Sequence, residues 1–513
     1  MASLALLPAE LLHDIFVYLL DPAYGDITDS YRAFAGLASS CRALNRISTQ
    51  YLYSRYESSI EQPIAGFLRK ILNSDDLRPS LKHISILGGT QPVYHQTVQR
   101  RLRRELKADV AKLPEPYRST WSHLAHGNLA IRNDIELAIL FLQASNVESL
   151  AIAKDAGRAV RMFDDLSQPP PYLLPLTNAG QTYSAHHRPP TTTLPYQHLH
   201  SLTLNLQSSR PSSLVHLFAL PALQSLHFRN LLDHAYLKWL RDGGGWEDLN
   251  TYPHPDPWLS SCIPHPSLTS LVLEDIHIPM SDITWMINAC EHLHTFDIVG
   301  GSDTMSYHVP SESRRWCIDI LRCLMVHRET LEYLRVDPHL CYPHHADGHD
   351  EWESINGFMH FPHLKSLDTT FSNLVGHPPA RLDANGALQF ADNSSAQNWW
   401  TPFCDAVPAS IERLRVRFDG ILECECDALF LVLLHGELPN LKSVEAYYHY
   451  GNVFLFSRKT HPIDFWDVQR SFRNHGRIDF IYKIGFELWG SGALHRELLG
   501  VRVHFSFIQS AKC

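Results

Sequence analysis

The sequence predicts an α/β protein in which a short N-terminal helical module precedes a long array of repeated units that form a parallel sheet. One observation is a stripe of apolar residues at helical spacing within the first 60 residues. Another is the hexamer apolar-x-x-apolar-x-apolar, which recurs ten times between residues 81 and 446. The composition agrees, because 44% hydrophobic and 19% charged residues over 513 positions describe a folded protein. We expect the helical module at residues 1–60, the array at 61–450 and a cap at 451–513.

The first 60 residues predict three short helices. Pro8 suits the first turn of a helix, because its missing N–H is not needed there. Apolar residues then follow at helical spacing: Leu11, Leu12, Ile15, Phe16 and Leu19. Two further helices carry apolar residues on one side: Phe34, Leu37, Ala38 and Cys41, then Leu44, Ile47, Tyr51 and Leu52. Helices this short are not stable alone, so they must pack on one another or on a partner.

Two segments of this module resemble the F-box family. The opening Leu7-Pro8-Ala9-Glu10-Leu11-Leu12, with Ile15-Phe16 and Leu19, is similar to the start of an F-box, and Leu37 to Leu44 is similar to its second half. The resemblance covers about the first 55 residues, the size of a small domain. The segment 21–30 is longer than the usual linker of the family, and Leu44 stands where the family often has tryptophan.

The resemblance implies that the module binds a Skp-type adaptor and joins a cullin–RING ubiquitin ligase of the SCF type. It assigns the adaptor contact to ten residues: Leu7, Pro8, Leu11, Leu12, Ile15, Phe16, Leu19, Leu37, Cys41 and Leu44. The alternative is that the apolar stripe packs only against the rest of the chain.

The ten hexamers predict ten strands, each with one buried face. They begin at Leu81, Val147, Leu199, Leu223, Leu268, Leu293, Leu331, Leu364, Ile411 and Leu441. Helical segments at 282–290, 316–326 and 426–434 each precede a copy, and a repeated helix–turn–strand unit gives a parallel sheet with helices on its outer side.

This array resembles the leucine-rich-repeat proteins, in an irregular form. The distances between copies vary widely, and Thr369 and Ala446 stand where a larger apolar residue is expected. We expect the insertions at 164–197, 243–266 and 372–398 to be surface loops. Within the cap, the stretches 480–489 and 501–507 read as strands.

The array predicts a surface that contacts a target protein. Residues between the apolar positions of a strand point to the opposite, concave face. Near the C-terminal end of the array these residues are charged or aromatic: Tyr333, Arg335, Asp337, Asp368, Arg413, Arg415, Arg417, Glu445 and Tyr447. One hypothesis is that the three arginines of a single strand bind an acidic or phosphorylated segment. The alternative is that they pair with Asp368 and Glu445 across strands or keep the surface soluble.

Other classes of site have little support. The cluster Arg100, Arg101, Arg103, Arg104 and Lys107 is interpreted as a solvated helix face, because acidic residues interleave and the net charge is -10, so no nucleic-acid partner is expected. No metal site is expected at the pair Cys424 and Cys426, or in the loop with His344, His345, His349, Asp347 and Asp350.

The chain is expected to be a non-catalytic subunit. It contains no nucleotide loop, nucleophile elbow, zinc-protease helix or dinucleotide turn, so we expect no enzyme activity and no cofactor. No apolar run reaches the length of about 20 residues of a membrane span, and sparse cysteines suit a reducing compartment, so we expect a cytoplasmic or nuclear protein without a membrane partner. The leading interpretation is the substrate receptor of an SCF-type ligase, and the alternative is a non-ligase F-box scaffold or interaction module.

Overall fold

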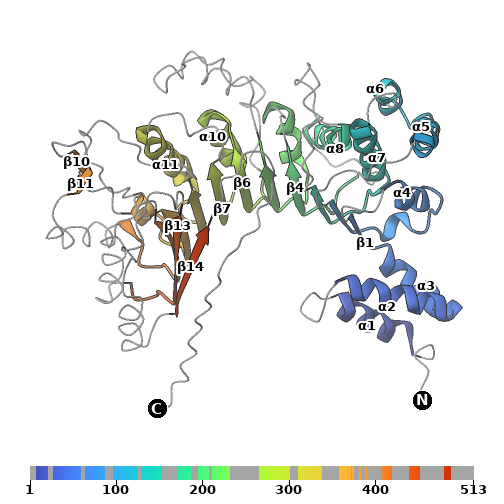
Figure 1. Cartoon of the computed structure of the whole chain (residues 1–513), viewed down its shortest axis with the longest axis horizontal. Coiled ribbons are helices and arrows are strands. Elements are labelled where there is room, and N and C mark those ends of the chain that lie inside the picture. Colours follow the sequence, from blue (N-terminus) through green and yellow to red (C-terminus); the bar gives the residue numbers. More distant parts are fainter. Residues whose placement is uncertain are drawn as a thin grey trace. The chain divides into compact units, whose positions relative to one another are not determined.

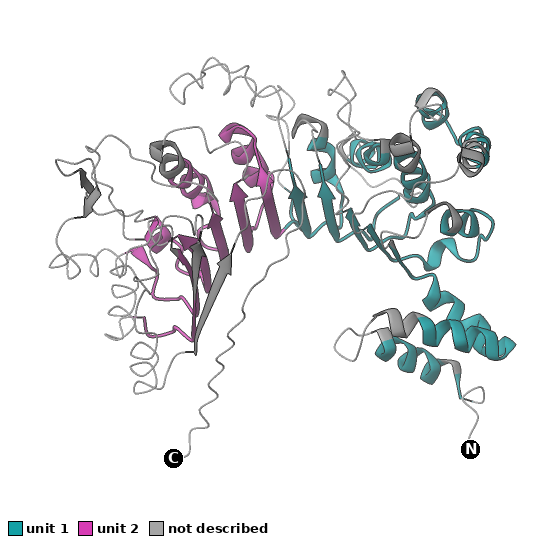
Figure 2. Ribbon diagram, in the orientation of Figure 1, with its two compact units in different colours: residues 1–232, 256–268 teal, residues 233–255, 269–513 magenta. Residues whose placement is uncertain are grey.

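The structure is a computed structural model of the whole chain. It describes these residues: 7–20, 27–58, 64–86, 96–124, 129–152, 171–185, 195–206, 211–231, 265–300, 310–337, 357–370, 373–374, 380–382, 388–390, 406–418, 438–450 and 479–486. The chain divides into two compact units (Figure 2), one of Met1–Leu232 with Asp256–Leu268 and the other of Asp233–Pro255 with Thr269–Cys513.

The first unit begins with the three predicted helices, α1 Ala9–Leu20, α2 Ile27–Ser40 and α3 Arg42–Leu52 (Figure 1). Pro8 lies just before α1, and its carbonyl accepts the N–H of Leu12 at 3.1 Å. The core of the module consists of four buried side chains, Leu12, Phe16, Phe34 and Leu44. Partly buried apolar side chains surround this core: Leu7, Leu19, Leu37, Ile47, Tyr51 and Leu52.

The rest of the first unit is a parallel sheet with helices between its strands. The strands follow one another in sequence order: β1 Arg55–Ser58, β2 His83–Ile86, β3 Ser149–Ile152, β4 Ser201–Asn205 and β5 Ser225–Arg229. The intervening helices are α4 Ile64–Leu72, η3 Arg78–Ser80, α5 Gln96–Val110, α6 Tyr117–Leu124, α7 Leu129–Gln143, η5 Pro171–Leu173, α8 Leu174–Ala185 and η6 Pro211–Ala219. Because β1 pairs with β2, the sheet begins within the range 1–60 expected for the helical module alone.

The second unit is a parallel sheet of the same kind. Its strands are β6 Ser270–Ile276, β7 Thr295–Gly300, β8 Tyr333–Asp337, β9 Ser366–Thr370, β12 Arg413–Phe418, β13 Ser443–Tyr450 and β14 Asp479–Phe486. Its helices are α10 Met280–Asn288, α11 Pro310–Leu324, η10 Met325–His327 and η11 Phe358–His360. Helices α10 and α11 pack on each other on one side of these strands (Figure 1).

All ten predicted strands are present, and each begins two residues after the start of its hexamer. The central apolar residues of the hexamers lie in register with one another, which places them on one face of each sheet. They are all at most 1% exposed: Ile84, Leu150, Leu202, Leu226, Leu271, Phe296, Leu334, Leu367, Leu414 and Val444. A shared burial pattern and register therefore explain why this hexamer recurs.

Backbone hydrogen bonds hold the strands in this register at their N-terminal ends. The carbonyl of Lys82 accepts the N–H groups of both Glu148 and Ser149, at 2.7 and 3.1 Å. The carbonyl of Lys365 accepts those of Glu412 and Arg413 in the same way, at 2.8 and 2.9 Å. If a strand slipped by one residue, these hydrogen bonds would break and its apolar residues would point outward.

Thr369 lies at a position where an apolar residue is expected, and hydrogen bonds satisfy its hydroxyl group. Its side chain is 0% exposed, its hydroxyl donates to the carbonyl of Val336 at 3.3 Å, and it accepts the side-chain N–H of Asn373 at 3.1 Å. A buried hydroxyl with both partners costs little, so the threonine is compatible with a buried strand.

Two of the three expected loops contain regular structure. Residues 171–185, within the range 164–197, form η5 and α8, because the apolar side chains of Tyr172, Leu173 and Leu176 are buried there. Within 372–398, β10 Ala380–Leu382 and β11 Leu388–Phe390 form an antiparallel pair. The prediction of a surface loop was therefore wrong for residues 171–185, and the segment 372–398 contains a short antiparallel strand pair. The stretch 480–489 contains the predicted strand, as β14, and 501–507 lies outside the described residues.

Buried histidines support the turns before two strands. In the first unit, His265 Nε2–H donates to the carbonyl of Leu220 at 2.8 Å, while Nδ1 accepts the N–H groups of Ser267 and Leu268 at 3.2 and 3.1 Å. In the second unit, His327 Nε2–H donates to the carbonyl of Ile287 at 3.0 Å. Burial lowers the pKa of both imidazoles, which favours the neutral form that these bonds require.

Candidate partner-binding surfaces

The apolar residues of α1 divide between two faces. Leu12 and Phe16 point inward and are 2% and 0% exposed, whereas Leu11 and Ile15 are 49% and 36% exposed. Residues three and four apart share a helix face, so Tyr18, which is 53% exposed, extends the outward row. We call Leu11, Ile15 and Tyr18 the outer stripe of α1. An exposed apolar row of this kind is typical of a surface that contacts another protein.

Of the ten residues assigned to the adaptor contact, the structure brings four to the surface. Pro8, Leu11, Ile15 and Cys41 are exposed. The remaining six contribute wholly or partly to the core of the module: Leu12, Phe16, Leu44, Leu7, Leu19 and Leu37. On α1 the assigned residues therefore fall into a core row, Leu12 and Phe16, and a surface row, Leu11 and Ile15. The sequence interpretation also missed Val17 and Tyr18, which are exposed apolar residues of α1.

The inward row is fixed by aromatic packing. The ring of Phe16 meets the rings of Phe34 and Tyr51 edge to face, each at a centroid distance of 5.3 Å. The Tyr51 hydroxyl also lies 2.5 Å from Nδ1 of His13. These contacts set the rotation of α1 about its own axis and so leave the outer stripe facing away from the core.

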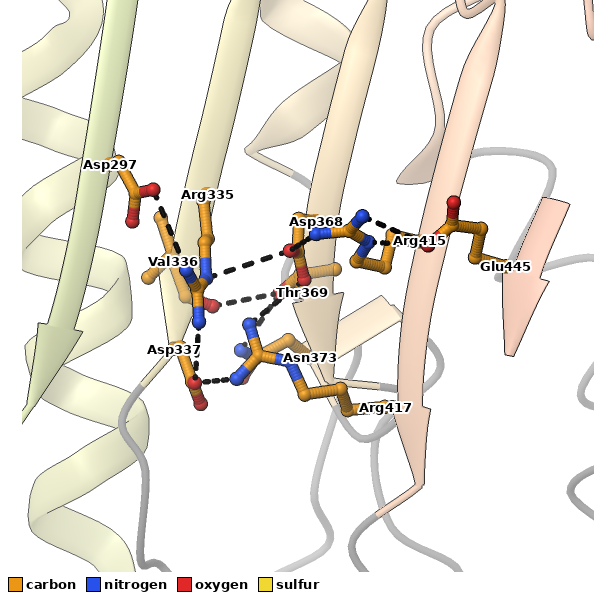
Figure 3. A network of polar contacts seen from close by, with 10 residues as sticks. All are labelled: Asp297, Arg335, Val336, Asp337, Asp368, Thr369, Asn373, Arg415, Arg417 and Glu445. Carbon is orange, nitrogen blue, oxygen red and sulfur yellow. Dashed lines mark hydrogen bonds and ion pairs between the residues drawn. The ribbon is translucent and has the colours of Figure 1, made fainter. Parts of the chain in front are cut away.

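A second surface is the polar face of the second unit's sheet. Five charged residues at equivalent strand positions lie in register on β7, β8, β9, β12 and β13: Asp297, Arg335, Asp368, Arg415 and Glu445. We call them the charged row (Figure 3). Their signs alternate from strand to strand, so each arginine has a carboxylate on both sides.

Ion pairs connect the members of the charged row. Arg335 lies 3.5 Å from Asp297 and 3.5 Å from Asp368. Arg415 lies 3.3 Å from Asp368, and its Nε donates to Glu445 at 2.9 Å. The row is therefore a continuous chain of opposite charges across five strands (Figure 3).

Two further residues extend this network at the next strand position. Arg417 donates to Asp368 at 2.8 Å and also pairs with Asp337, which lies two strands away on β8. Arg335 lies 3.6 Å from the same Asp337. Asp368 thus contacts Arg335, Arg415 and Arg417. Burial raises the pKa of Asp368 to about 6, and the charges of Arg335 and Arg415 oppose that rise.

Most of the residues predicted to contact a target belong to this face. Tyr333 is half-buried beside the row, and burial raises its pKa to about 12. Arg413 is exposed, and Tyr447 pairs in register with Arg417, although its side chain is outside the described residues. Asp297 was missed, although it occupies in its hexamer the position that Arg335 occupies in the next. Arg415 and Arg417 make cross-strand pairs, as the alternative interpretation expects, with Asp368 as a partner of both and Glu445 as a partner of Arg415.

Of the other candidate sites from the sequence, the structure describes only the basic helix. Helix α5 is present, Arg101, Arg104 and Lys107 are exposed on it, and Arg101 pairs with Glu105 at 2.9 Å. The histidine loop 344–350 and the cysteine pair 424–426 lie outside the described residues. Within the described ranges, no group of three or more histidine, cysteine or acidic side chains is arranged to hold a metal ion. No helix in that same part of the chain is long and apolar enough to cross a membrane.

Compared with models of known protein families and with curated protein sequences, the chain matches none.

Proposed function

We propose that this chain is an F-box-type substrate receptor of an SCF-type cullin–RING ubiquitin ligase. In this account the helical module at residues 1–60 binds a Skp-type adaptor, and a leucine-rich-repeat-like array holds a target protein, in the cytoplasm or the nucleus. The observation that carries the proposal is the outer stripe of α1, in which Leu11 and Ile15 are exposed apolar side chains outside the module's core.

The division of α1 into two faces supports this function. Leu12 and Phe16 are the buried core residues that α1 contributes, whereas Leu11 and Ile15 of the same helix are exposed. Apolar and aromatic anchors on a pre-formed surface are the residues that usually dominate an interface. The order of segments agrees with the F-box resemblance, which begins at Leu7-Pro8 and therefore at the end of α1 that carries Leu11.

The receptor contributes proximity, and the other subunits of the ligase transfer ubiquitin. Holding a target near a charged conjugating enzyme raises the effective concentration of its lysines without any chemistry on this chain. The repeated parallel strands supply a polar face on which a target can be held.

The proposal is tested by charging the outer stripe. We expect Leu11→Glu with Ile15→Glu to abolish co-purification of the Skp-type adaptor from cells, because burying two carboxylates in an apolar interface is strongly unfavourable. Val326→Glu is the matched control, since Val326 is a 67% exposed apolar residue of the second unit. Undiminished adaptor recovery with the double variant would refute the proposal.

The same experiment distinguishes a ligase subunit from a scaffold. Recovery of a cullin together with the adaptor is the result expected of the ligase. Recovery of the adaptor alone would favour a non-ligase F-box scaffold.

A further inference from the structure

We propose that the target segment held by the charged row carries mixed charge, with two acidic residues between two basic ones, and is not a phosphorylated or uniformly acidic segment. This inference rests on the proposed function, because it assumes that the polar face of the array contacts the target. It follows from which members of the row are covered and which are exposed.

The arginines cover the central carboxylates. The side chains of Asp337 and Asp368 are 4% and 3% exposed, whereas those of Arg335 and Arg415 are 29% and 39% exposed. At the two ends of the row the carboxylates emerge again, Asp297 at 16% and Glu445 at 22%. An approaching partner therefore meets negative, positive, positive and negative charge in that order across the strands.

A phosphorylated segment does not suit this surface. The ion pairs of the described side chains join three arginines to four carboxylates, so these seven groups carry no positive excess when all are ionised: Arg335, Arg415, Arg417, Asp297, Asp337, Asp368 and Glu445. A phosphate at the guanidinium groups would add negative charge beside Asp368, which is already bound to the same arginines.

The spacing of the strands sets the length of the segment. Neighbouring strands lie about 4.8 Å apart, so Asp297 and Glu445, four strand spacings apart, are separated by about 19 Å. An extended chain advances about 3.3 Å per residue, so about six steps, which join seven residues, cross this distance. Side chains of an extended segment alternate between faces, which places every second residue against the sheet.

These constraints describe a seven-residue segment of the form Lys-x-Glu-x-Glu-x-Lys lying across the strands. Its two acidic residues face Arg335 and Arg415, and its two basic residues face Asp297 and Glu445. The carboxylates hold both guanidinium groups in place before the target arrives, so little side-chain freedom is lost on binding.

The test compares two peptides of identical composition on the full-length chain at pH 7.5. One has the order Lys-x-Glu-x-Glu-x-Lys and the other the inverted order Glu-x-Lys-x-Lys-x-Glu, with serine at every x. We expect the first to bind about tenfold more tightly, which is what several exposed ion pairs supply together. The preference should disappear in 1 M salt, where the Debye length is about 3 Å.

Variants locate the effect on the row. Arg415→Gln should remove the preference while Asp368 keeps Arg335 and Arg417 as partners. Arg322→Gln, which changes a 75% exposed arginine paired with Asp319, should retain it. Adaptor co-purification should be unchanged in both variants, so this inference can fail while the proposed function stands.

Three results would overturn the inference. These are equal binding of the two peptides, tighter binding of the inverted peptide or of a phosphoserine peptide of the same length, and no binding of either peptide at millimolar concentration.

Discussion

Truncation to alanine should strongly destabilise the helical module at one residue of α1 and barely affect its stability at the adjacent residue. Phe16 is fully buried against Phe34 and Tyr51, whereas Ile15 is 36% exposed on the outer stripe. Replacing a buried phenylalanine by alanine costs about 3–5 kcal/mol. Replacing an exposed apolar residue usually changes stability by less than about 0.5 kcal/mol.

The helical module is small, so the stability lost in Phe16→Ala is a large part of its total free energy of unfolding. At roughly 0.05–0.15 kcal/mol per residue, a module of about 50 residues has a free energy of unfolding of about 2.5–7.5 kcal/mol. The cost of Phe16→Ala is comparable with this total, so the three helices should unfold or open frequently. Ile15→Ala should leave them folded and weaken only the adaptor contact.

Hydrogen–deuterium exchange of the full chain measures this directly. Peptides from α1, α2 and α3 should exchange much faster in Phe16→Ala than in the parent, and those from β3 or β8 should not change. In Ile15→Ala every peptide should exchange as in the parent. Unchanged exchange of the three helices in Phe16→Ala would refute the assignment of a core row and a surface row.

Three further variants test the network, the buried histidines and the packing of the first unit. Arg417→Ala, which leaves two buried carboxylates with fewer partners, should cost about 2–4 kcal/mol, compared with less than about 1 kcal/mol for the exposed Arg322→Ala, as measured by denaturant midpoints of the second unit. Burial lowers the pKa of His327, so its neutral form stabilises the fold above the unfolded pKa of about 6.5, and this stability is lost as pH falls below that value. The melting temperature of the parent should accordingly fall between pH 7 and 5.5, and that of His327→Gln should fall less. An equal fall in the parent and the variant would contradict this reasoning. A Cβ at Gly180 would overlap the backbone carbonyl of His216, so Gly180→Ala should destabilise the first unit by about 1–3 kcal/mol, and a melting temperature equal to that of the parent would show that the two segments separate readily.

The strands were predictable because one short pattern specifies both burial and register. The apolar positions of each hexamer are the residues that enter the core, and a shift of the strand by one residue would expose all of them. The same pattern predicted where the charged row lies, because Arg335, Asp368, Arg415 and Glu445 occupy one position of it. Aligning all ten hexamers would also have found Asp297.

Other features depend on contacts that are distant in sequence. Helix α8 lies in a Pro- and Thr-rich stretch, and its apolar residues are buried through contact with η6, which is distant in sequence. The two faces of α1 are both apolar, so helical periodicity alone does not tell which row enters the core. The aromatic contacts of Phe16 with Phe34 and Tyr51 decide this, and they join residues up to 35 positions apart.

The pairing of the arginines was open for a related reason. Alternating charges on neighbouring strands favour cross-strand pairs, but the sequence alone does not give the exposure of each side chain. The near-complete burial of Asp368 beneath Arg335 and Arg415 changes the expected ligand from an acidic segment to one of mixed charge.

Binding of the purified full-length chain to a purified Skp-type adaptor tests the central claim most directly. Isothermal titration calorimetry should give a one-to-one complex with the parent and with Val326→Glu, and no measurable heat with the Leu11→Glu, Ile15→Glu double variant. No complex with the parent at micromolar concentration, or an equal affinity for the parent and the double variant, would contradict the account.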